Sequence, residues 1–144
     1  MLLAIAITLT SPALAGHVVQ GEDDGCWVSA VEWDENGRET KQVSAWIDYS
    51  LPNWSYDKDT GIVWTTDDWQ TVNWADGWYE STRWDGRERW GVDIQPAQAF
   101  LMHPQVPGGD VVFEYAIFYR IGGASWWDDN GGANYTIDLS PSCD

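Results

Sequence analysis

The sequence predicts an all-β protein that folds as an antiparallel β-sandwich in a single domain. Apolar residues recur with a period of two, the pattern of half-buried strands, and no segment shows a helical period. Clusters of Gly, Pro, Asn and Asp separate these segments at short intervals, as in sandwiches. The chain of 144 residues also holds 12 Trp, 6 Tyr and 3 Phe, enough aromatic area for a core, a binding surface or both.

The first fifteen residues, MLLAIAITLTSPALA, predict a cleaved signal peptide. They carry no charge, contain an apolar run and end in small-x-small, the pattern of a processing site. The alternative is a buried first strand or helix, and the run is too short to span a membrane. Residues 16–25 are then an acidic flexible lead-in, 26–143 form the sandwich, and the protein is expected in a secreted or periplasmic location.

The strands are expected in order along the chain after this lead-in. The strand prediction is strongest for residues 110–121, because Phe113, Tyr115, Ile117 and Tyr119 fall on one face. The expected strand segments are 26–33, 41–49, 60–66, 88–94, 110–121 and 134–139. The turns between them include DENGR, LPNW, DKDTG, WADG, WDGR, VPGGD and DDNGG.

The two cysteines, Cys26 and Cys143, are expected to form a disulfide, because an exported protein meets an oxidising environment. Two free buried thiols are the alternative. The formal net charge of −16 excludes a nucleic-acid partner, since phosphate backbones would be repelled. We expect a monomer without a membrane span and without a cofactor.

Catalytic and metal sites find little support in the residue pattern. The acidic residues lie in turn-type sequence, whereas glycoside hydrolysis needs two carboxyl groups across a cleft. The segments DKDTG and DENG are too short for an EF-hand loop, so no metal site is predicted. His17 and His103 are isolated in the sequence and are interpreted as surface residues. A small hydrolase is therefore the weakest of the functional alternatives.

Tryptophans in or beside turns are the most informative feature. Six of them are not easily absorbed by a sandwich core: Trp69, Trp74, Trp78, Trp84, Trp126 and Trp127. An indole covers the apolar face of a sugar ring, while Asn and Asp side chains bind hydroxyl groups at its edge. The pattern indicates carbohydrate binding. A flat patch of Trp74, Trp78 and Trp84 that docks a protein or a surface component is the alternative.

Two segments, YDKDTGIVWTTDDWQT and FEYAIFYRIGGASWWDDNGGANY, resemble the carbohydrate-binding modules of family 21. The resemblance covers residues 42–139 and implies an immunoglobulin-like β-sandwich that binds an α-glucan such as starch or glycogen and performs no chemistry. It also implies site residues. Trp69 and Trp127 match the sugar platform, and Asp128, Asn130 and Asn134 match the polar positions that follow it.

The resemblance implies a second sugar site as well, and it shows departures from the family pattern. Asn53, Tyr56 and Lys58 fit a short Asn-x-x-Tyr-x-Lys pattern, and Tyr79 matches a further aromatic. At the first site, Asp129 replaces an amide, and Ala116 stands where starch-binding members have a tyrosine. No docking motif for a phosphatase is present. The prediction is an exported, non-catalytic protein whose partner is a polysaccharide.

Overall fold

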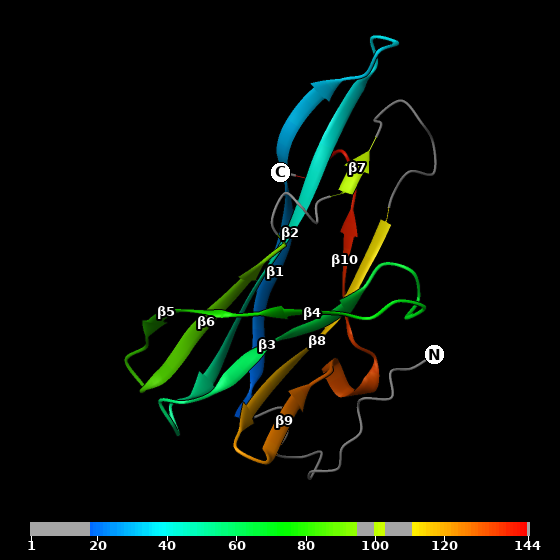
Figure 1. The fold of residues 1–144 in the computed structure, drawn as a ribbon. Coiled ribbons are helices and arrows are strands. Elements are labelled where there is room, and N and C mark those ends of the chain that lie inside the picture. Colours follow the sequence, from blue (N-terminus) through cyan, green and yellow to red (C-terminus); the bar gives the residue numbers. More distant parts are fainter. Residues whose placement is uncertain (1–17, 95–99, 103–110, 144) are drawn as a thin grey trace.

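The chain folds into two antiparallel sheets packed face to face (Figure 1). The computed structural model describes residues 18–94, 100–102 and 111–143. The segment predicted to be a signal peptide lies outside the described residues, as do His17 and His103. The prediction of an all-β antiparallel sandwich is confirmed.

The first sheet has the order β1-β2-β6-β5, and β7 also pairs with β2. Its long strand β2 pairs along most of its length with β1, while β6 and β7 share its other edge. The bounds of these strands are β1 Gln20–Trp33, β2 Glu39–Pro52, β5 Trp78–Thr82, β6 Arg87–Asp93 and β7 Phe100–Met102.

The second sheet has the order β10-β8-β3-β4, and β9 also pairs with β8. One edge of β8 is shared in the same way, by β10 along its first half and by β9 along its second. The bounds are β3 Asp59–Thr65, β4 Asn73–Asp76, β8 Val111–Ile121, β9 Ala124–Asp128 and β10 Tyr135–Leu139, with a short 3-10 turn η3 at Asn130–Gly132.

The core lies between the sheets, and it confirms the period-two alternation of the main strands. Inward-facing residues of β2, β3, β6, β8 and β10, together with Ile94 just after β6, are buried together. They include Val43, Ala45, Ile47, Tyr49, Leu51, Ile62, Trp64, Val92, Ile94, Phe113, Tyr115, Ile117, Tyr119, Ile137 and Leu139. Their removal from water supplies the main favourable contribution to folding.

The N-terminal part of the sandwich differs from the sequence prediction. Residues 16–25 were expected to be a flexible lead-in, but from Gln20 onward the chain is strand β1, with Asp24 opposite Ile47 on β2. The β1–β2 hairpin extends well beyond the rest of the sandwich (Figure 1). The expectation was wrong because a run of acidic residues is typical of solvated, irregular chain. Here, backbone pairing with β2 and contacts to the second sheet make the segment a strand.

The predicted disulfide between Cys26 and Cys143 is confirmed. It joins the middle of β1 to the segment that follows β10, across a sequence separation of 117 residues. Within the described part of the chain, no helix has the length and apolar character needed to cross a lipid bilayer.

Candidate functional site

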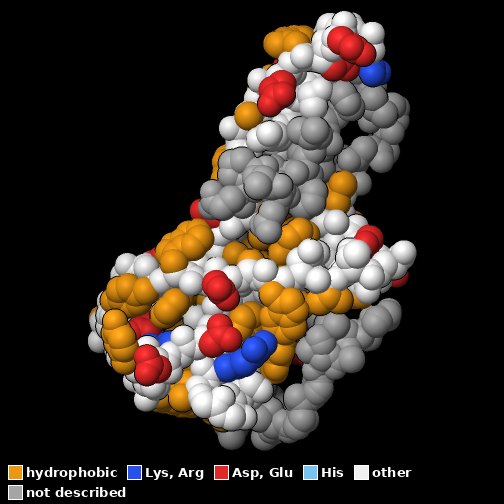
Figure 2. All heavy atoms as spheres, viewed as in Figure 1, with side chains coloured by type: hydrophobic (Ala, Val, Ile, Leu, Met, Phe, Trp, Pro, Cys, Tyr) orange, Lys and Arg blue, Asp and Glu red, His pale blue; other side chains and the backbone are white. Residues whose placement is uncertain are grey.

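Aromatic side chains gather on the outer face of the second sheet, on the side away from the core. Trp74 on β4 and Trp127 on β9 have ring centres 6.0 Å apart, and both rings also contact Phe118 on β8. Trp74 is 50% exposed and Trp127 is partly exposed. Figure 2 shows hydrophobic side chains gathered on the face that carries β3, β4 and β8, beside basic and acidic groups. Phe118 is 2% exposed and lies beneath the two indoles, so we call Trp74 and Trp127 the outer aromatic surface.

Trp127 is placed on this face by the alternation within β9. Trp126 packs against the main core between the sheets, so its neighbour Trp127 points to the opposite side. Opposite it on β8 is Phe118, in direct register. The sequence predicted that Trp126 and Trp127 lie beside a turn, whereas in the structure both belong to strand β9. Trp126 therefore faces the core, and Trp127 faces the outer side of the sheet.

Trp69 lies beneath this surface rather than on it. Its side chain is 8% exposed and forms a small cluster with Val63 and Ala116, against which Trp127 packs. Its indole nitrogen Nε1 has no hydrogen-bond partner among the described residues. The sequence-predicted pair Trp69 and Trp127 is therefore brought together, but as an inner and an outer layer. The small side chain of Ala116 leaves room for the inner ring.

The turn that carries Trp69 is built around Asp67. Its carboxylate accepts hydrogen bonds from Thr65 Oγ1 at 2.7 Å, Thr71 Oγ1 at 2.6 Å and the Thr71 amide at 2.9 Å. The Trp69 amide donates to Thr65 Oγ1 at 3.1 Å. This network holds Asp68 and Trp69 at φ values of 59° and 67°, in the left-handed region that few side chains adopt. The turn thus fixes the inner indole.

Acidification is expected to loosen this turn. The hydrogen bonds from Thr71 and Thr65 lower the pKa of Asp67 to about 2, against an ordinary value of about 3.9. A lowered folded-state pKa means that the carboxylate stabilises the turn above about pH 4 and loses this effect as the pH falls to about 2. NMR signals of the Trp69 backbone amide and indole should shift across that window.

Asp67→Asn is the matched control, because it removes the titrating group while keeping a similar shape. Its Trp69 signals should lack the transition between about pH 4 and 2. Wild-type Trp69 signals that stay unchanged throughout that window would contradict the role given to Asp67.

Asp128 lies where β1 packs against the second sheet, a contact that we call the seam, and its side chain bonds there. It is 7% exposed, and its Oδ2 accepts hydrogen bonds from the Gly21 amide at 2.7 Å and from the Tyr135 hydroxyl at 2.8 Å. Its Oδ1 accepts from the Asn130 amide at 3.1 Å. These bonds position the loop that follows β9. They leave Asp128 little capacity for a ligand.

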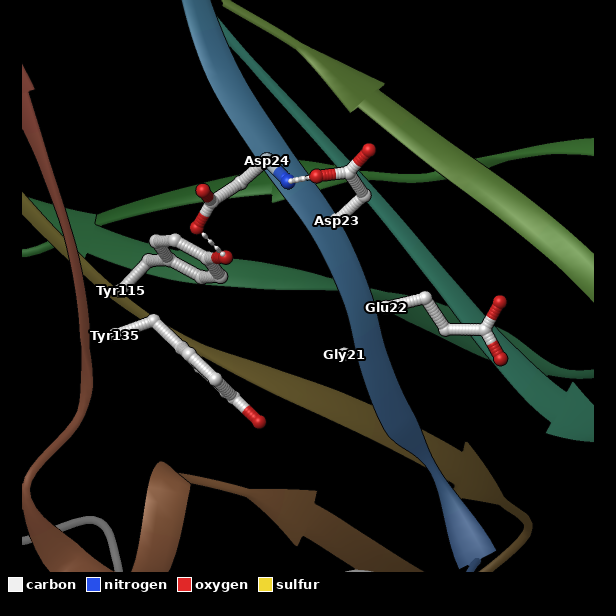
Figure 3. A pocket seen from close by; sticks show the side chains of 6 residues that line it. All are labelled: Gly21, Glu22, Asp23, Asp24, Tyr115 and Tyr135. Atoms are coloured by element: carbon white, nitrogen blue, oxygen red, sulfur yellow. Dashed lines mark hydrogen bonds between the residues drawn. The ribbon is translucent and has the colours of Figure 1, made fainter.

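The seam also contains a small cavity of about 180 Å³ (Figure 3). Tyr115 and Tyr135 stack there with ring centres 5.3 Å apart, and the Tyr115 hydroxyl donates to Asp24 Oδ2 at 2.6 Å. Burial, together with the hydrogen bond to Asp24, raises the pKa of Tyr115 well above its usual range. A side chain at Gly21 would lie about 3.2 Å from the Tyr135 ring, so only glycine fits without displacement. The contacts around this cavity hold β1 against the second sheet.

The two asparagines after β9 are bonded to each other and to Glu114 on β8, whose side chain alternates with the core-facing residues of that strand. Asn130 and Asn134 have φ values of 56° and 62°, and the Asn130 side chain donates to the Asn134 carbonyl at 3.1 Å. The Asn134 side chain donates to Glu114 Oε2 on β8 at 2.9 Å. Asn tolerates the left-handed conformation better than most residues, which explains why Asn occupies these two positions of the loop. Together with Glu114 they provide amide and carboxylate groups beside the tryptophans.

The second predicted set of residues is only partly assembled. Lys58 Nζ lies 3.2 Å from Asn53 Oδ1, 3.3 Å from Glu88 Oε1 and 5.8 Å from the centre of the Trp90 ring. Tyr79 approaches the same Trp90, with ring centres 6.1 Å apart. The lysine is therefore occupied by an ion pair in a nearly buried position.

Tyr56 lies at the surface beside this set. Its side chain is 95% exposed and lines a cavity together with Lys58, Arg120 and Gly122. The sequence patterns did not indicate Arg120, whose guanidinium lies over the Trp74 and Phe118 rings. The alternation of strand β8 could have indicated Arg120. It lies next to the core-facing Tyr119, so its side chain points to the outer face of the sheet.

The alternative of one flat docking patch requires Trp74, Trp78 and Trp84 on one face. Trp74 lies on β4 of the second sheet, whereas Trp78 lies on β5 of the first. Trp84 follows β5 in the turn before β6 and is 94% exposed. The chain crosses between the sheets at Gly77, so the three indoles do not share one sheet face.

A catalytic alternative would use carboxyl groups with raised pKa values, and such groups occur on the first sheet. Burial, with a further contribution from Asp48, raises the pKa of both Glu80 and Asp93. Arg89 forms an ion pair with Asp48 at 3.4 Å. Asp93 lies between two buried residues, Val92 and Ile94. Side chains alternate along a strand, so Asp93 and its neighbours in this cluster face outward from the sandwich. Within the described residues, no group of three or more metal-ligating side chains is assembled.

Comparison with known proteins adds a family match. Residues 31–138, well over half of the chain, match the sequence model of a family described as "Carbohydrate/starch-binding module (family 21)". No curated protein matches the chain.

Two solved structures are similar to this chain. One is the starch-binding domain of Rhizopus oryzae glucoamylase in complex with β-cyclodextrin and maltoheptaose, with 16% identity, a TM-score of 0.49 and coverage of 81% of this chain and 94% of that chain. The other is the carbohydrate-binding module of the muscle glycogen-targeting subunit of protein phosphatase-1, with 23% identity, a TM-score of 0.46 and coverage of 83% and 78%.

Proposed function

This chain belongs to the family 21 carbohydrate/starch-binding modules, and on that premise we propose that it binds an α-glucan of the starch or glycogen type without catalysing a reaction. The observation that carries the proposal is the pair formed by exposed Trp74 and partly exposed Trp127 on one sheet face, with ring centres 6.0 Å apart and polar groups beside it. Indole faces cover the apolar faces of glucose units, and neighbouring amides and carboxylates bind their hydroxyl groups.

The residues at this surface take different roles in the proposal. Trp127 and Trp74 contact the sugar, and Trp69 supports Trp127 from beneath. Asn130, Asn134 and Glu114 offer hydrogen-bonding groups at the edge. Asp128 acts indirectly, by holding the loop that carries the two asparagines. Lys58 and Tyr79 contact Trp90, and Asn53 accepts a hydrogen bond from Lys58, in a second, more occupied contact region.

Export to an oxidising compartment is also proposed. The disulfide between Cys26 and Cys143 supports it, because disulfides persist mainly in secreted, periplasmic and extracellular proteins. The net charge of −16 favours an uncharged polysaccharide over an anionic one. A neutral glucan outside the reducing cytosol fits both observations.

Wild-type protein is expected to bind maltoheptaose and β-cyclodextrin, and to sediment with insoluble starch. A shallow, hydrated site of this kind predicts a Kd of order 1 µM to 1 mM, which isothermal titration calorimetry measures directly. The β-linked cellohexaose is the matched ligand control, since it presents the same sugar in a different chain geometry.

A second control tests whether exposed indoles bind sugar regardless of their place. Trp84→Ala removes an indole that is 94% exposed and lies away from the outer aromatic surface, so affinity should remain at the wild-type value. Absence of heat and of sedimentation with wild-type protein, at millimolar ligand, would overturn the proposed function.

A further inference from the structure

Trp74 reaches its place on the outer aromatic surface by crossing a neighbouring strand. It lies on β4, at the edge of the second sheet, and β3 separates that strand from β8. Its ring nevertheless contacts Phe118 on β8, with ring centres 5.3 Å apart. The β3 partner of Phe118 is Gly61, so β3 presents no side chain at this register position. The indole therefore extends over β3, and Trp74 remains 50% exposed.

The contacts among the three rings do not fix the Trp74 indole by themselves. Trp74 meets Phe118 at an interplanar angle of 67° and Trp127 at 65°, so both contacts are edge-to-face. An exposed side chain that is held only by ring edges exchanges readily between rotamers. A ligand then has to order the indole, and the ordering of each side chain costs affinity. A further contact that holds the ring removes this cost.

Arg120 on β8 supplies such a contact. It lies two positions after Phe118 on the same face of the strand, and its guanidinium carbon is 4.5 Å from the centre of the Phe118 ring. The same carbon lies over the Trp74 ring, 5.1 Å from its centre. Nη1 is 3.5 Å from Oδ2 of Asp59, the direct partner of Arg120 on β3. The guanidinium is thus held by an opposite charge while it covers an aromatic ring, an arrangement that suits arginine.

We infer that Arg120 is a positioning residue for glucan binding, which holds the Trp74 indole in place across β3. The inference rests on the proposed function, in which Trp74 contacts a glucose unit. Because the guanidinium covers one face of the indole, the sugar meets the other face or the ring edge. Arg120 acts through Trp74, by ordering its ring before the ligand arrives.

A direct hydrogen bond from Arg120 to a sugar hydroxyl is the alternative role, since the side chain is 39% exposed and carries several N–H donors. The two roles differ in their dependence on Trp74. A positioning role disappears when Trp74 is absent, whereas a direct bond to the sugar remains.

A double-mutant cycle with maltoheptaose, measured by isothermal titration calorimetry on the full chain, separates these roles. Arg120→Met removes the charge, keeps an unbranched side chain and should raise Kd about two- to fivefold. Arg120→Lys keeps the charge without the planar group and should give an intermediate Kd. Trp74→Ala retains Trp127 for binding, and in that background Arg120→Met should cause no further change.

Arg89→Met is the matched control. Arg89 is also a strand arginine in an ion pair, 3.4 Å from Asp48 Oδ2, and its side chain is 40% exposed. It lies on β6 of the first sheet, whereas the outer aromatic surface belongs to the second. Its replacement should leave the Kd for maltoheptaose at the wild-type value.

Fluorine NMR tests the positioning of Trp74 without any ligand. In protein labelled with fluorotryptophan, the Trp74 signal is identified as the one that Trp74→Phe removes. This signal should shift and broaden in Arg120→Met, because the ring loses the guanidinium that covers it. It should keep its position and width in Arg89→Met.

A wild-type Kd or an unchanged Trp74 signal in Arg120→Met would overturn the positioning role. An equal loss of affinity with and without Trp74 would overturn it as well, in favour of direct sugar contact. Each of these outcomes leaves the proposed function standing. If wild type binds no maltoheptaose, the proposed function fails, and the fluorine signal still decides whether Arg120 holds Trp74.

Discussion

Loss of the Cys26–Cys143 disulfide is expected to lower the free energy of unfolding by about 2–5 kcal/mol. The bond spans 117 residues of sequence, and a long closed loop restricts the unfolded chain strongly. It also anchors the C-terminal segment to the middle of β1, which is otherwise held to the second sheet by the hydrogen bonds around Asp24 and Asp128.

Urea unfolding with and without reductant measures this effect, and the Cys26→Ser/Cys143→Ser double variant provides the control. Reductant should shift the wild-type midpoint to lower urea and should leave the double variant unchanged. A reduced wild-type protein that unfolds at the same midpoint as the oxidised one would contradict the prediction.

Trp127→Ala is expected to weaken maltoheptaose binding by about ten- to a hundredfold. Large aromatic residues at the centre of an interface commonly contribute about 2 kcal/mol or more, and each 1.4 kcal/mol corresponds to a tenfold change in Kd. Trp127 is the side chain that both contacts Trp74 at the surface and covers the Trp69 cluster. Its loss removes a contact area and exposes the inner layer at once.

Calorimetry on Trp127→Ala, with near-ultraviolet circular dichroism to verify the fold, measures this prediction. Trp127→Phe is the conservative variant and should recover part of the affinity, because a smaller ring still covers a sugar face. A folded Trp127→Ala protein that binds maltoheptaose with wild-type affinity would remove Trp127 from the site.

The strands with strict alternation could be predicted from the sequence because burial of one face dictates their period. In β8, Phe113, Tyr115, Ile117 and Tyr119 all point into the core as the pattern predicts. The short strands β4, β5, β7 and β9 were missed, because each is only three to five residues long and none shows a clear alternation of its own. Pairing with a longer neighbouring strand, rather than their own pattern, makes them strands.

The candidate site was predicted in its residue types more than in its arrangement. Turn-borne tryptophans beside Asn and Asp indicated the outer aromatic surface, and Trp127 lies there. The pattern did not separate the buried Trp69 from the exposed Trp74, because both follow polar turn residues in the sequence. Their difference arises where the turn around Asp67 folds back over Val63.

By itself, the sequence predicted a sandwich, a disulfide between its two cysteines and more indoles than a sandwich core easily absorbs, and the structure confirms the first two. Alternation, cysteine number and composition are properties of the chain that survive any particular packing. Only the tertiary structure decided which rings face water and that the Arg120 guanidinium lies over the Trp74 and Phe118 rings. Those relations depend on strand register and on side chains from distant segments meeting across a sheet, and no local pattern carries that information.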